Sequence, residues 1–266
     1  VQQNSDSWEQ GQEARTLLIA QSLSRQAVAA QPKPDLIAWS EDSLRRPYER
    51  SRAYYKNFPP DDPLADFLRQ VRTPVLLGSL TFNDQVEWWL NGAQLLNSRG
   101  GIEHTYGKVQ LVPFAEYVPF GDIPAVAYFY EEIVGIYSKG LVPGPEFSLF
   151  SVRNKAGETV NFAVPICFED SFPYVGRAFA KQGADFFLNI TNDSWSKTAS
   201  AQTQHYAAAR FRAIETRRPL VRSSNSGVTA IVDPWGRTLA MLPFFQEDYL
   251  NATVQLYDTS TPTVYL

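Results

Sequence analysis

Cysteine and histidine are scarce in this chain of 266 residues, which contains one cysteine and two histidines. A single cysteine excludes an intramolecular disulfide and any zinc site built from several cysteines. Two histidines also argue against a histidine-rich metal site. We therefore expect no metal centre.

The chain also lacks an excess of basic residues and any long apolar run. Its formal net charge is −4 at pH 7, which argues against a general nucleic-acid-binding surface. No run reaches the roughly 18 apolar residues that a membrane-spanning helix needs. Hydrophobic residues make up 44% and charged residues 20%, which predicts a folded globular protein rather than a disordered one.

The first residues predict that more of the protein lies upstream. The chain begins Val1-Gln2-Gln3, with no initiator methionine and no basic or apolar segment typical of a signal peptide. Val1-Gln2 resembles the end of a strand whose beginning is missing. We therefore expect a piece of a larger membrane protein.

Helical and strand-like patterns alternate along the chain. Helical periodicity covers residues 8–30, 62–71, 173–182 and 203–217, and strand-like apolar runs cover 36–39, 74–80, 87–96, 159–166, 185–190, 220–223 and 228–232. Strands that alternate with helices predict a layered α/β fold with helices outside the sheets. The sequence shows no internal repeat, low-complexity tract or interior linker, so we predict one domain over residues 1–266.

The one cysteine lies at a position typical of a nucleophile. Cys167 follows the apolar run Val160–Ile166, and Phe168, Glu169 and Asp170 come directly after it. Ligands of α/β proteins bind in the crevice at the carboxyl ends of parallel strands. A thiol there is a candidate nucleophile if a base and a cation are at hand, although a buried, inert thiol is the more common interpretation of a lone cysteine.

Two other predicted strand ends supply a base and a cation. Glu41 follows the buried strand pattern Leu36–Trp39, and Lys108 precedes the apolar segment Val109–Phe120. We predict that Glu41 is the general base, with a pKa raised by an apolar pocket, although alone it could open the next helix. We predict that Lys108 points into a cleft and stabilises an oxyanion, although a lone lysine is usually solvated.

The order and context of Glu41, Lys108 and Cys167 resemble the nitrilase, or carbon–nitrogen hydrolase, superfamily, whose fold is a four-layer α-β-β-α sandwich. A closer resemblance is to the periplasmic catalytic domain of the apolipoprotein N-acyltransferases. It covers nearly the whole chain and rests on four stretches of sequence: Tyr106–Pro119, Ile166–Glu169, Thr191–Trp195 and the region from Gln204 to Thr229.

The sequence departs from this family pattern at four positions: Ser40 stands where proline is usual, Ala115 where glycine is, Phe168 where tyrosine is, and Ser194 where alanine is. Ser40 lacks the fixed φ of proline ahead of Glu41. Phe168 lacks a hydroxyl beside the nucleophile. None of these changes removes a catalytic group, so they bear on rate and substrate fit rather than on the reaction class.

The resemblance implies accessory residues around the triad. Glu116 and Glu169 match carboxylates of the family that orient Lys108 and assist proton transfer. Phe168 is an accessory residue beside the nucleophile. For Glu169, a purely structural ion pair is the alternative role. We interpret His205 as structural. We interpret a series of arginines as structural too, held in buried ion pairing with Glu215. These are the arginines at 210, 212, 217, 218 and 222.

The segment Ile123–Val142 is rich in aromatic and aliphatic residues. An ordinary core helix would explain part of this composition. A lid that meets lipid would explain the clustered aromatic rings, because amphipathic rings prefer a membrane interface. On the second interpretation, we predict that Phe129, Ile133 and Trp195 bind substrate.

The resemblance implies an acyltransferase that moves a phospholipid acyl chain, through a Cys167 thioester, onto the N-terminal amine of a diacylglyceryl-cysteine lipoprotein. It implies no cofactor, and it implies three partners: a phospholipid donor, a lipoprotein N-terminus and the membrane surface. The implied location is the bacterial inner (cytoplasmic) membrane, with the catalytic domain on the periplasmic side. Two alternatives stay open: a soluble nitrilase-type amidase that hydrolyses a small amide or carbamoyl compound with the same triad, and a non-catalytic binding domain.

Overall fold

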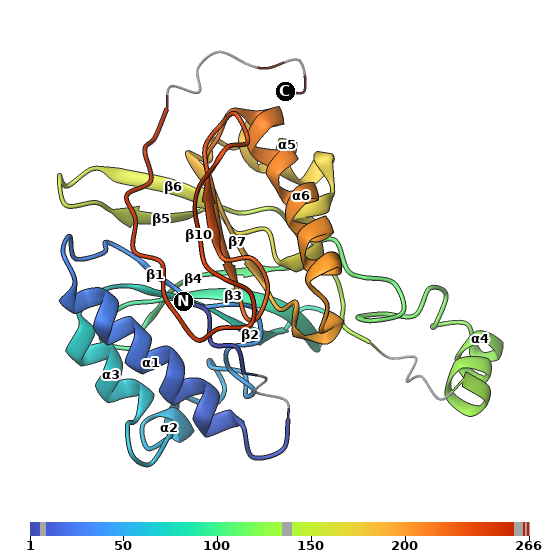
Figure 1. The fold of residues 1–266 in the computed structure, drawn as a ribbon. Coiled ribbons are helices and arrows are strands. Elements are labelled where there is room, and N and C mark those ends of the chain that lie inside the picture. Colours follow the sequence, from blue (N-terminus) through green and yellow to red (C-terminus); the bar gives the residue numbers. More distant parts are fainter. Residues whose placement is uncertain (6–8, 135–139, 258–262, 264, 266) are drawn as a thin grey trace.

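The computed structural model describes residues 1–5, 9–134, 140–257, 263 and 265. Two β-sheets lie against each other in the middle of the molecule (Figure 1). Helices cover the outer face of each sheet, blue and cyan helices on one side and a yellow and an orange helix on the other (Figure 1). The predicted four-layer α-β-β-α sandwich is therefore confirmed.

The first sheet has four strands in the order β1-β2-β3-β4, namely β1 (Ile37–Ala38), β2 (Val75–Asn83), β3 (Trp88–Leu96) and β4 (Ile102–Gly107). β1 runs parallel to β2, and the other neighbours are antiparallel. The helices on its outer face are α1 (Glu13–Ala29), α2 (Arg52–Tyr55) and α3 (Leu64–Val71). Their apolar side chains form one buried cluster with Trp39, whose ring lies 5.5 Å from that of Phe67.

The second sheet has six strands in the order β10-β9-β8-β7-β6-β5. Their bounds are β5 (Phe150–Arg153), β6 (Thr159–Ala163), β7 (Phe186–Thr191), β8 (Leu220–Ser224), β9 (Ala230–Val232) and β10 (Thr238–Met241). The central strands β6, β7 and β8 are parallel, and α5 (Pro173–Lys181) and α6 (Ala199–Thr216) cover the outer face. Short 3₁₀ helices follow two of these strands: η2 (Cys167–Ser171) after β6 and η3 (Ser194–Ser196) after β7.

The predicted helices and strands are present, with ends that shift by a few residues, as is usual for element boundaries. Helix α1 begins at Glu13 rather than at residue 8, and β6 ends at Ala163 rather than at residue 166. β4 is absent from the predicted strands, and so are the two edge strands of the second sheet, β5 and β10. Both are four residues long and mostly exposed, so they lack the alternation of buried and exposed residues that marks a half-buried strand.

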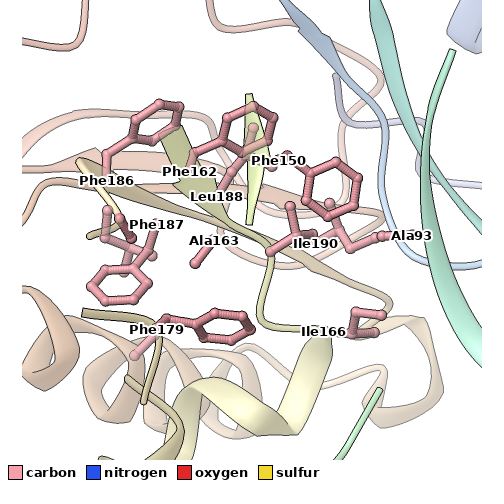
Figure 2. Close-up of a cluster of buried hydrophobic side chains, with 14 of the residues drawn as sticks. Ala93, Phe150, Phe162, Ala163, Ile166, Phe179, Phe186, Phe187, Leu188 and Ile190 are labelled. Carbon is pink, nitrogen blue, oxygen red and sulfur yellow. The ribbon is translucent and has the colours of Figure 1, made fainter. Parts of the chain in front are cut away.

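The main hydrophobic core fills the space between the sheets and continues beneath α5 and α6. Phe162 stacks between Phe150 and Phe186, with ring centroids 5.5 and 5.2 Å away. Phe179 of α5 lies on the opposite face of the strand, and Ala93 approaches from the first sheet (Figure 2). Packing on both faces of β6 fixes the direction in which the chain leaves this strand toward Cys167.

An arm leaves the body of the molecule after β4 and carries α4 (Pro124–Tyr128) and the π-helix η1 (Phe129–Val134), at the right of Figure 1. None of the residues of α4 is buried, and the exposed fraction reaches 74% at Phe120 and 65% at Tyr128. The core-helix interpretation is therefore wrong for residues 123–134. Residues 135–139 of the predicted segment lie outside the described residues.

Truncation of Phe162 should destabilise the chain strongly. Phe162→Ala removes a fully buried ring that contacts two others, which should lower the free energy of unfolding by about 3–5 kcal/mol. Urea unfolding followed by circular dichroism measures this loss. Phe120→Ala is the matched control, because the same truncation at a ring that is 74% exposed should change stability by less than about 0.5 kcal/mol. Equal losses in the two variants would contradict the described core.

Candidate active site

The three residues predicted to form the catalytic triad come from the ends of three strands. Glu41 follows β1, Lys108 follows β4, and Cys167 begins η2 just after β6. Glu41 and Lys108 are 5% and 1% exposed, whereas Cys167 is partly exposed. The charges of both buried residues act on the thiol, so the structure brings the three together.

Glu41 is held by hydrogen bonds to both carboxylate oxygens. Its Oε1 accepts from the Asn91 amide at 2.7 Å, and its Oε2 accepts from the backbone N–H of Asn192 at 2.8 Å. The backbone of Glu41 also lies so close to β2 that a Cβ on Gly78 would come within 2.6 Å of its Cα. Only glycine allows this approach, so the carboxylate is fixed in place before any substrate arrives.

Lys108 lies between two carboxylates. Its Nζ is 2.9 Å from Glu116 and 3.8 Å from Oε1 of Glu41. The side-chain amide of Asn91 donates one hydrogen to Glu41 and another to Glu116, at 2.7 Å each. One ammonium and one amide thus satisfy two buried carboxylates, which is the condition for burying such charges at tolerable cost.

The turn at Cys167 has a strained backbone that is held by hydrogen bonds. Cys167 has φ +50°, a left-handed conformation that is uncommon for a residue with a Cβ. The Asn189 amide holds the turn by donating to the carbonyls of Pro165 and Cys167 at 3.0 and 3.2 Å. Within the described residues the Phe168 N–H has no acceptor, so this donor is free to bind an oxyanion beside the thiol.

Electrostatics keep the thiol neutral in the resting site. Burial and the negative charge of Glu41 raise the pKa of Cys167 well above its usual value, although Lys108 opposes the shift. Burial also raises the pKa of Glu41, against the effect of Lys108. For Lys108, burial opposes the charge, but the interactions with Cys167, Glu41 and Glu116 raise its pKa. Glu41 is the carboxylate whose charge acts most on the neutral thiol.

Glu169 makes backbone contacts rather than the contact with Lys108 that the sequence predicts. Oε1 accepts from the Tyr106 hydroxyl and from the N–H groups of Val109 and Gln110, and Oε2 accepts from the Ile166 N–H, at distances of 2.8–3.0 Å. Burial raises the pKa of Glu169 to about 7. Its carboxylate ties the segment after the lysine to the turn before the cysteine.

A second buried network lies beneath the nucleophile. Arg222 donates to Asp170, to Asp193 at 3.0 Å and to the Asn189 oxygen at 2.8 Å. His205 lies between the two aspartates, 3.0 Å from Asp170 and 2.8 Å from Asp193. These contacts agree with the interpretation of His205 and Arg222 as structural.

The remaining arginines bind mostly to backbone rather than to carboxylates. Arg212 pairs with Glu215 at 2.8 Å, as the sequence predicts. Three others, which the sequence analysis also placed in ion pairs, donate instead to carbonyl oxygens: Arg210 to Gly236, Arg217 to Pro234, and Arg218 to Ala180, Ala184 and Thr216. The series is structural, but ion pairing explains only part of it.

The other predicted site residues differ in exposure and in place. Phe168 is 39% exposed and packs edge-on against Phe172 at 5.2 Å. Phe129 is 47% exposed on the arm, and the backbone of Ile133 belongs to η1, while its side chain lies outside the described part. Trp195 is 74% exposed and lines a surface cavity of about 460 Å³ that contains no member of the triad.

Three asparagines that complete the site are missed by the sequence analysis. Asn91 lies in the middle of β3, Asn189 in β7, and Asn192 just after β7. A polar amide in an otherwise apolar strand is a usable signal, because a buried amide must be hydrogen-bonded. The partners themselves cannot be read from the sequence, since they are set by strands far apart in the chain.

Removal of Arg222 should leave two buried carboxylates without their main partner. Arg222→Met is expected to cost about 3–5 kcal/mol of stability, because Asp170 and Asp193 stay buried. Arg15→Met is the matched control, since Arg15 is 62% exposed and pairs at 3.3 Å with Glu247, which is 40% exposed, and a surface pair of this kind is worth about 0–1 kcal/mol. Urea unfolding of both variants at neutral pH makes the comparison. A loss below about 1 kcal/mol for Arg222→Met would contradict the described network.

His205 should make stability depend on pH. Burial and Arg222 oppose a positive charge on its ring, but Asp170 and Asp193 outweigh them and raise its pKa from 6.5 to about 9. A group whose pKa is raised by folding gives stabilisation that is complete below pH 6.5 and lost as the pH rises through about 9. His205→Gln should reduce this alkaline decline in urea-unfolding measurements across that range. A variant that keeps the full decline would show that another group causes it.

Comparisons with known proteins agree with this geometry. The carbon-nitrogen hydrolase family model matches residues 1–261. Apolipoprotein N-acyltransferase 2 of Treponema denticola is 46% identical over 97% of this chain, and apolipoprotein N-acyltransferase of Borreliella burgdorferi is 32% identical over the whole chain. The chain spans about half the length of these curated relatives, 49% and 50%. Within the described residues, no helix has the length and hydropathy needed to span a membrane.

Solved structures of the same fold are more distant in sequence. An amidase from Nesterenkonia sp. is 17% identical, with a TM-score of 0.61 over 87% of this chain and 81% of the amidase. The C. elegans NitFhit protein is 19% identical, with a TM-score of 0.64 over 93% of this chain and 57% of that protein. At these identities the likeness concerns the fold, whereas the family match extends over nearly the whole sequence. The chain belongs to the carbon–nitrogen hydrolase family.

Proposed function

We propose that this chain is the catalytic domain of an acyltransferase that moves a phospholipid acyl chain to the N-terminal amine of a diacylglyceryl-cysteine lipoprotein. The observation that carries the proposal is a neutral thiol, Cys167, beside a fixed carboxylate and a buried ammonium. This arrangement suits covalent acyl transfer. The relatives named apolipoprotein N-acyltransferase, at up to 46% identity among those compared here, support the choice of substrates.

In the first half-reaction, the acyl chain moves from phospholipid to enzyme. Glu41 takes the thiol proton as Cys167 attacks the ester carbonyl, and the oxyanion that forms is stabilised by Lys108 and the Phe168 N–H. Collapse of the tetrahedral intermediate breaks the ester bond. The leaving alkoxide of the lysophospholipid takes the proton from Glu41, and a thioester remains on Cys167.

In the second half-reaction, the chain moves from enzyme to lipoprotein. The free α-amine of the diacylglyceryl-cysteine attacks the thioester carbonyl and gives up a proton to Glu41. The same two donors stabilise the second oxyanion, and Cys167 leaves as the thiolate, which recovers a proton from Glu41. The product is an amide, and the free enzyme is restored.

The exposed arm supports a lipid donor. A phospholipid stays in the bilayer, so its acyl chain can reach the thiol only from a membrane surface. Phe120, Tyr128 and Phe129 present large rings to solvent on an arm that begins just after Glu116. Such rings suit the headgroup boundary. On this proposal Phe129 and Ile133 guide the acyl chain, and Trp195 contacts substrate at the loop that carries Asn192.

The parent protein implied by this proposal is larger than the chain. Curated relatives are about twice as long, and their names place them among bacterial apolipoprotein N-acyltransferases. We propose that residues 1–266 form one domain of a protein of the bacterial inner membrane and that this domain faces the periplasm. Phospholipid, the lipoprotein N-terminus and the membrane surface are its proposed partners.

A small-molecule amidase is the alternative with the same triad. Solved amidases share the fold, but at 17–19% identity they carry no argument about substrate. Exposed aromatic rings on a protein surface generally mark a site that contacts a partner or a membrane. An amidase that acts on a small soluble compound would have no use for such an arm. The acyltransferase is therefore the function that the chain supports better.

Loss of the triad should abolish acyl transfer. Full-length protein is incubated with a phospholipid labelled in its acyl chain and a diacylglyceryl-cysteine peptide, and the labelled amide is measured. Cys167→Ser should give no product above background, because a hydroxyl at its ordinary pKa is a far weaker nucleophile. Lys108→Met should lower the rate by about 10²–10³-fold or more, as loss of an oxyanion donor does. Amide formation at the wild-type rate by either variant would contradict the proposal.

Polar substitutions on the arm should slow the acylation of Cys167 by phospholipid but not its reaction with a small soluble reagent. Phe129→Ser with Ile133→Ser should slow acylation from phospholipid vesicles by about tenfold or more, because a buried large side chain contributes about 1.5–3 kcal/mol. Alkylation of Cys167 by iodoacetamide should stay near the wild-type rate. Leu239→Ser with Met241→Ser is the control, since both residues are exposed apolar positions on β10. Equal loss of acylation in the two double variants would remove the arm from the substrate path.

A further inference from the structure

A strongly basic segment follows the loop that carries Glu41. Residues 45–56 contain five basic residues and one acidic residue, whereas the whole chain has a formal net charge of −4. All five basic side chains are exposed. These five, which we call the basic patch, are Arg45, Arg46, Arg50, Arg52 and Lys56.

Aromatic rings hold part of the basic patch in place. The guanidinium of Arg46 lies 4.1 Å from the centre of the Tyr54 ring, and that of Arg50 lies 3.6 Å from the centre of the Phe82 ring. Tyr54 in turn packs edge-on against Tyr55, which is buried. Stacking on a ring face orders a guanidinium without using its N–H donors. Less conformational freedom is therefore lost when these donors bind an anion.

Carboxylates reduce the positive charge of the basic patch without cancelling it. Asp84, which is 88% exposed, pairs with Arg50 at 3.2 Å. Glu49, within the segment, accepts from a backbone N–H of β2 at 3.2 Å, and Glu13 accepts from the Tyr54 hydroxyl at 3.4 Å. Five cations against these three carboxylates leave an excess of positive charge at the surface, which attracts anionic ligands.

The basic patch adjoins the segment that follows the arm. The ring beneath Arg50 packs edge-on against Trp89 at 5.0 Å. The Trp89 carbonyl accepts from the Val142 N–H at 3.0 Å, and the Trp88 indole donates to the Gly140 carbonyl at 2.6 Å. In Figure 1, α2, which carries part of the basic patch, and the arm both lie in the lower part of the view, opposite α5. One flat surface can therefore meet both.

We propose that the basic patch binds the anionic headgroups of a bilayer and, together with the arm, sets the domain on the membrane. This inference rests on the proposed function, in which the acyl donor lies in the membrane. Guanidinium groups bind phosphate through paired hydrogen bonds, and each basic residue near an anionic membrane strengthens binding by about fivefold. The partner is a lipid surface rather than an acidic protein, because the arm presents Phe120, Tyr128 and Phe129 to solvent, and such rings suit the headgroup boundary.

Photo-crosslinking shows which part of the protein contacts anionic headgroups. Full-length protein is reconstituted into vesicles of phosphatidylcholine and phosphatidylethanolamine that also contain an ether-linked phosphatidylglycerol with a photoreactive headgroup. The ether bonds prevent this lipid from donating an acyl chain. After digestion with chymotrypsin, which leaves arginine variants comparable, mass spectrometry should find the label on residues 45–56. High salt should reduce the labelling, because the Debye length falls from about 10 Å at 0.1 M to about 3 Å at 1 M.

Two double variants decide whether the basic patch is specific. Arg46→Gln with Arg50→Gln removes the two stacked guanidinium groups. Arg15→Gln with Arg69→Gln is the matched control, since these arginines are 62% and 65% exposed and the same charge is lost. The first pair should lower labelling of residues 45–56 by about tenfold or more, and the second by less than about twofold. Equal losses in the two variants, or labelling that high salt leaves unchanged, would overturn the role of the basic patch.

Acyl transfer in the same vesicles separates this inference from the proposed function. A labelled phosphatidylethanolamine serves as donor, and a diacylglyceryl-cysteine peptide serves as acceptor. Transfer without labelling of residues 45–56 would overturn the role of the basic patch and uphold the proposed function. Labelling of the basic patch without any transfer would uphold headgroup binding and overturn the proposed function.

Discussion

The buried ammonium of Lys108 is the charge on which the site depends. At 1% exposure it needs anionic partners, and it has Glu116 at 2.9 Å and Glu41 at 3.8 Å. Two carboxylates around one cation then need further donors, which Asn91 and the Asn192 N–H provide. Glu116 lies in the turn between Pro113 and Tyr117, and the other groups stand in a strand or close after one, so the sandwich fold places most of the charges and donors of the site.

Electrostatics favour the neutral form of the thiol. Burial and the charge of Glu41 raise the pKa of Cys167 well above its usual value, so the sulfur holds its proton in the resting site. Cys167 stands in a left-handed turn, with φ +50°, at the start of η2, and the Phe168 N–H comes directly after it. Beneath them, Arg222 and its partners hold the turn from the side of the second sheet.

Local patterns predict a layered α/β fold, because apolar runs mark buried strands, and they place Glu41, Lys108 and Cys167 beside such runs. The four-layer sandwich and the joint role of the three residues are implied by the resemblance to the nitrilase superfamily. The asparagines could not be assigned, since the bond from Asn91 to Glu41 depends on the pairing of β1, β2 and β3. The arm left two interpretations open, because a core helix and an exposed lid can share one composition. Only the absence of packing around α4 decides against the core helix.

The central claim is that Cys167 carries the acyl chain between donor and acceptor. The most direct measurement incubates full-length protein with phospholipid but without acceptor, digests it and locates any acyl group by tandem mass spectrometry. The account predicts one acyl adduct on the Cys167 peptide, which hydroxylamine releases and which disappears when a diacylglyceryl-cysteine peptide is added. An acyl group on another residue, or transfer to the acceptor from protein that carries no adduct at Cys167 at any time, would contradict it.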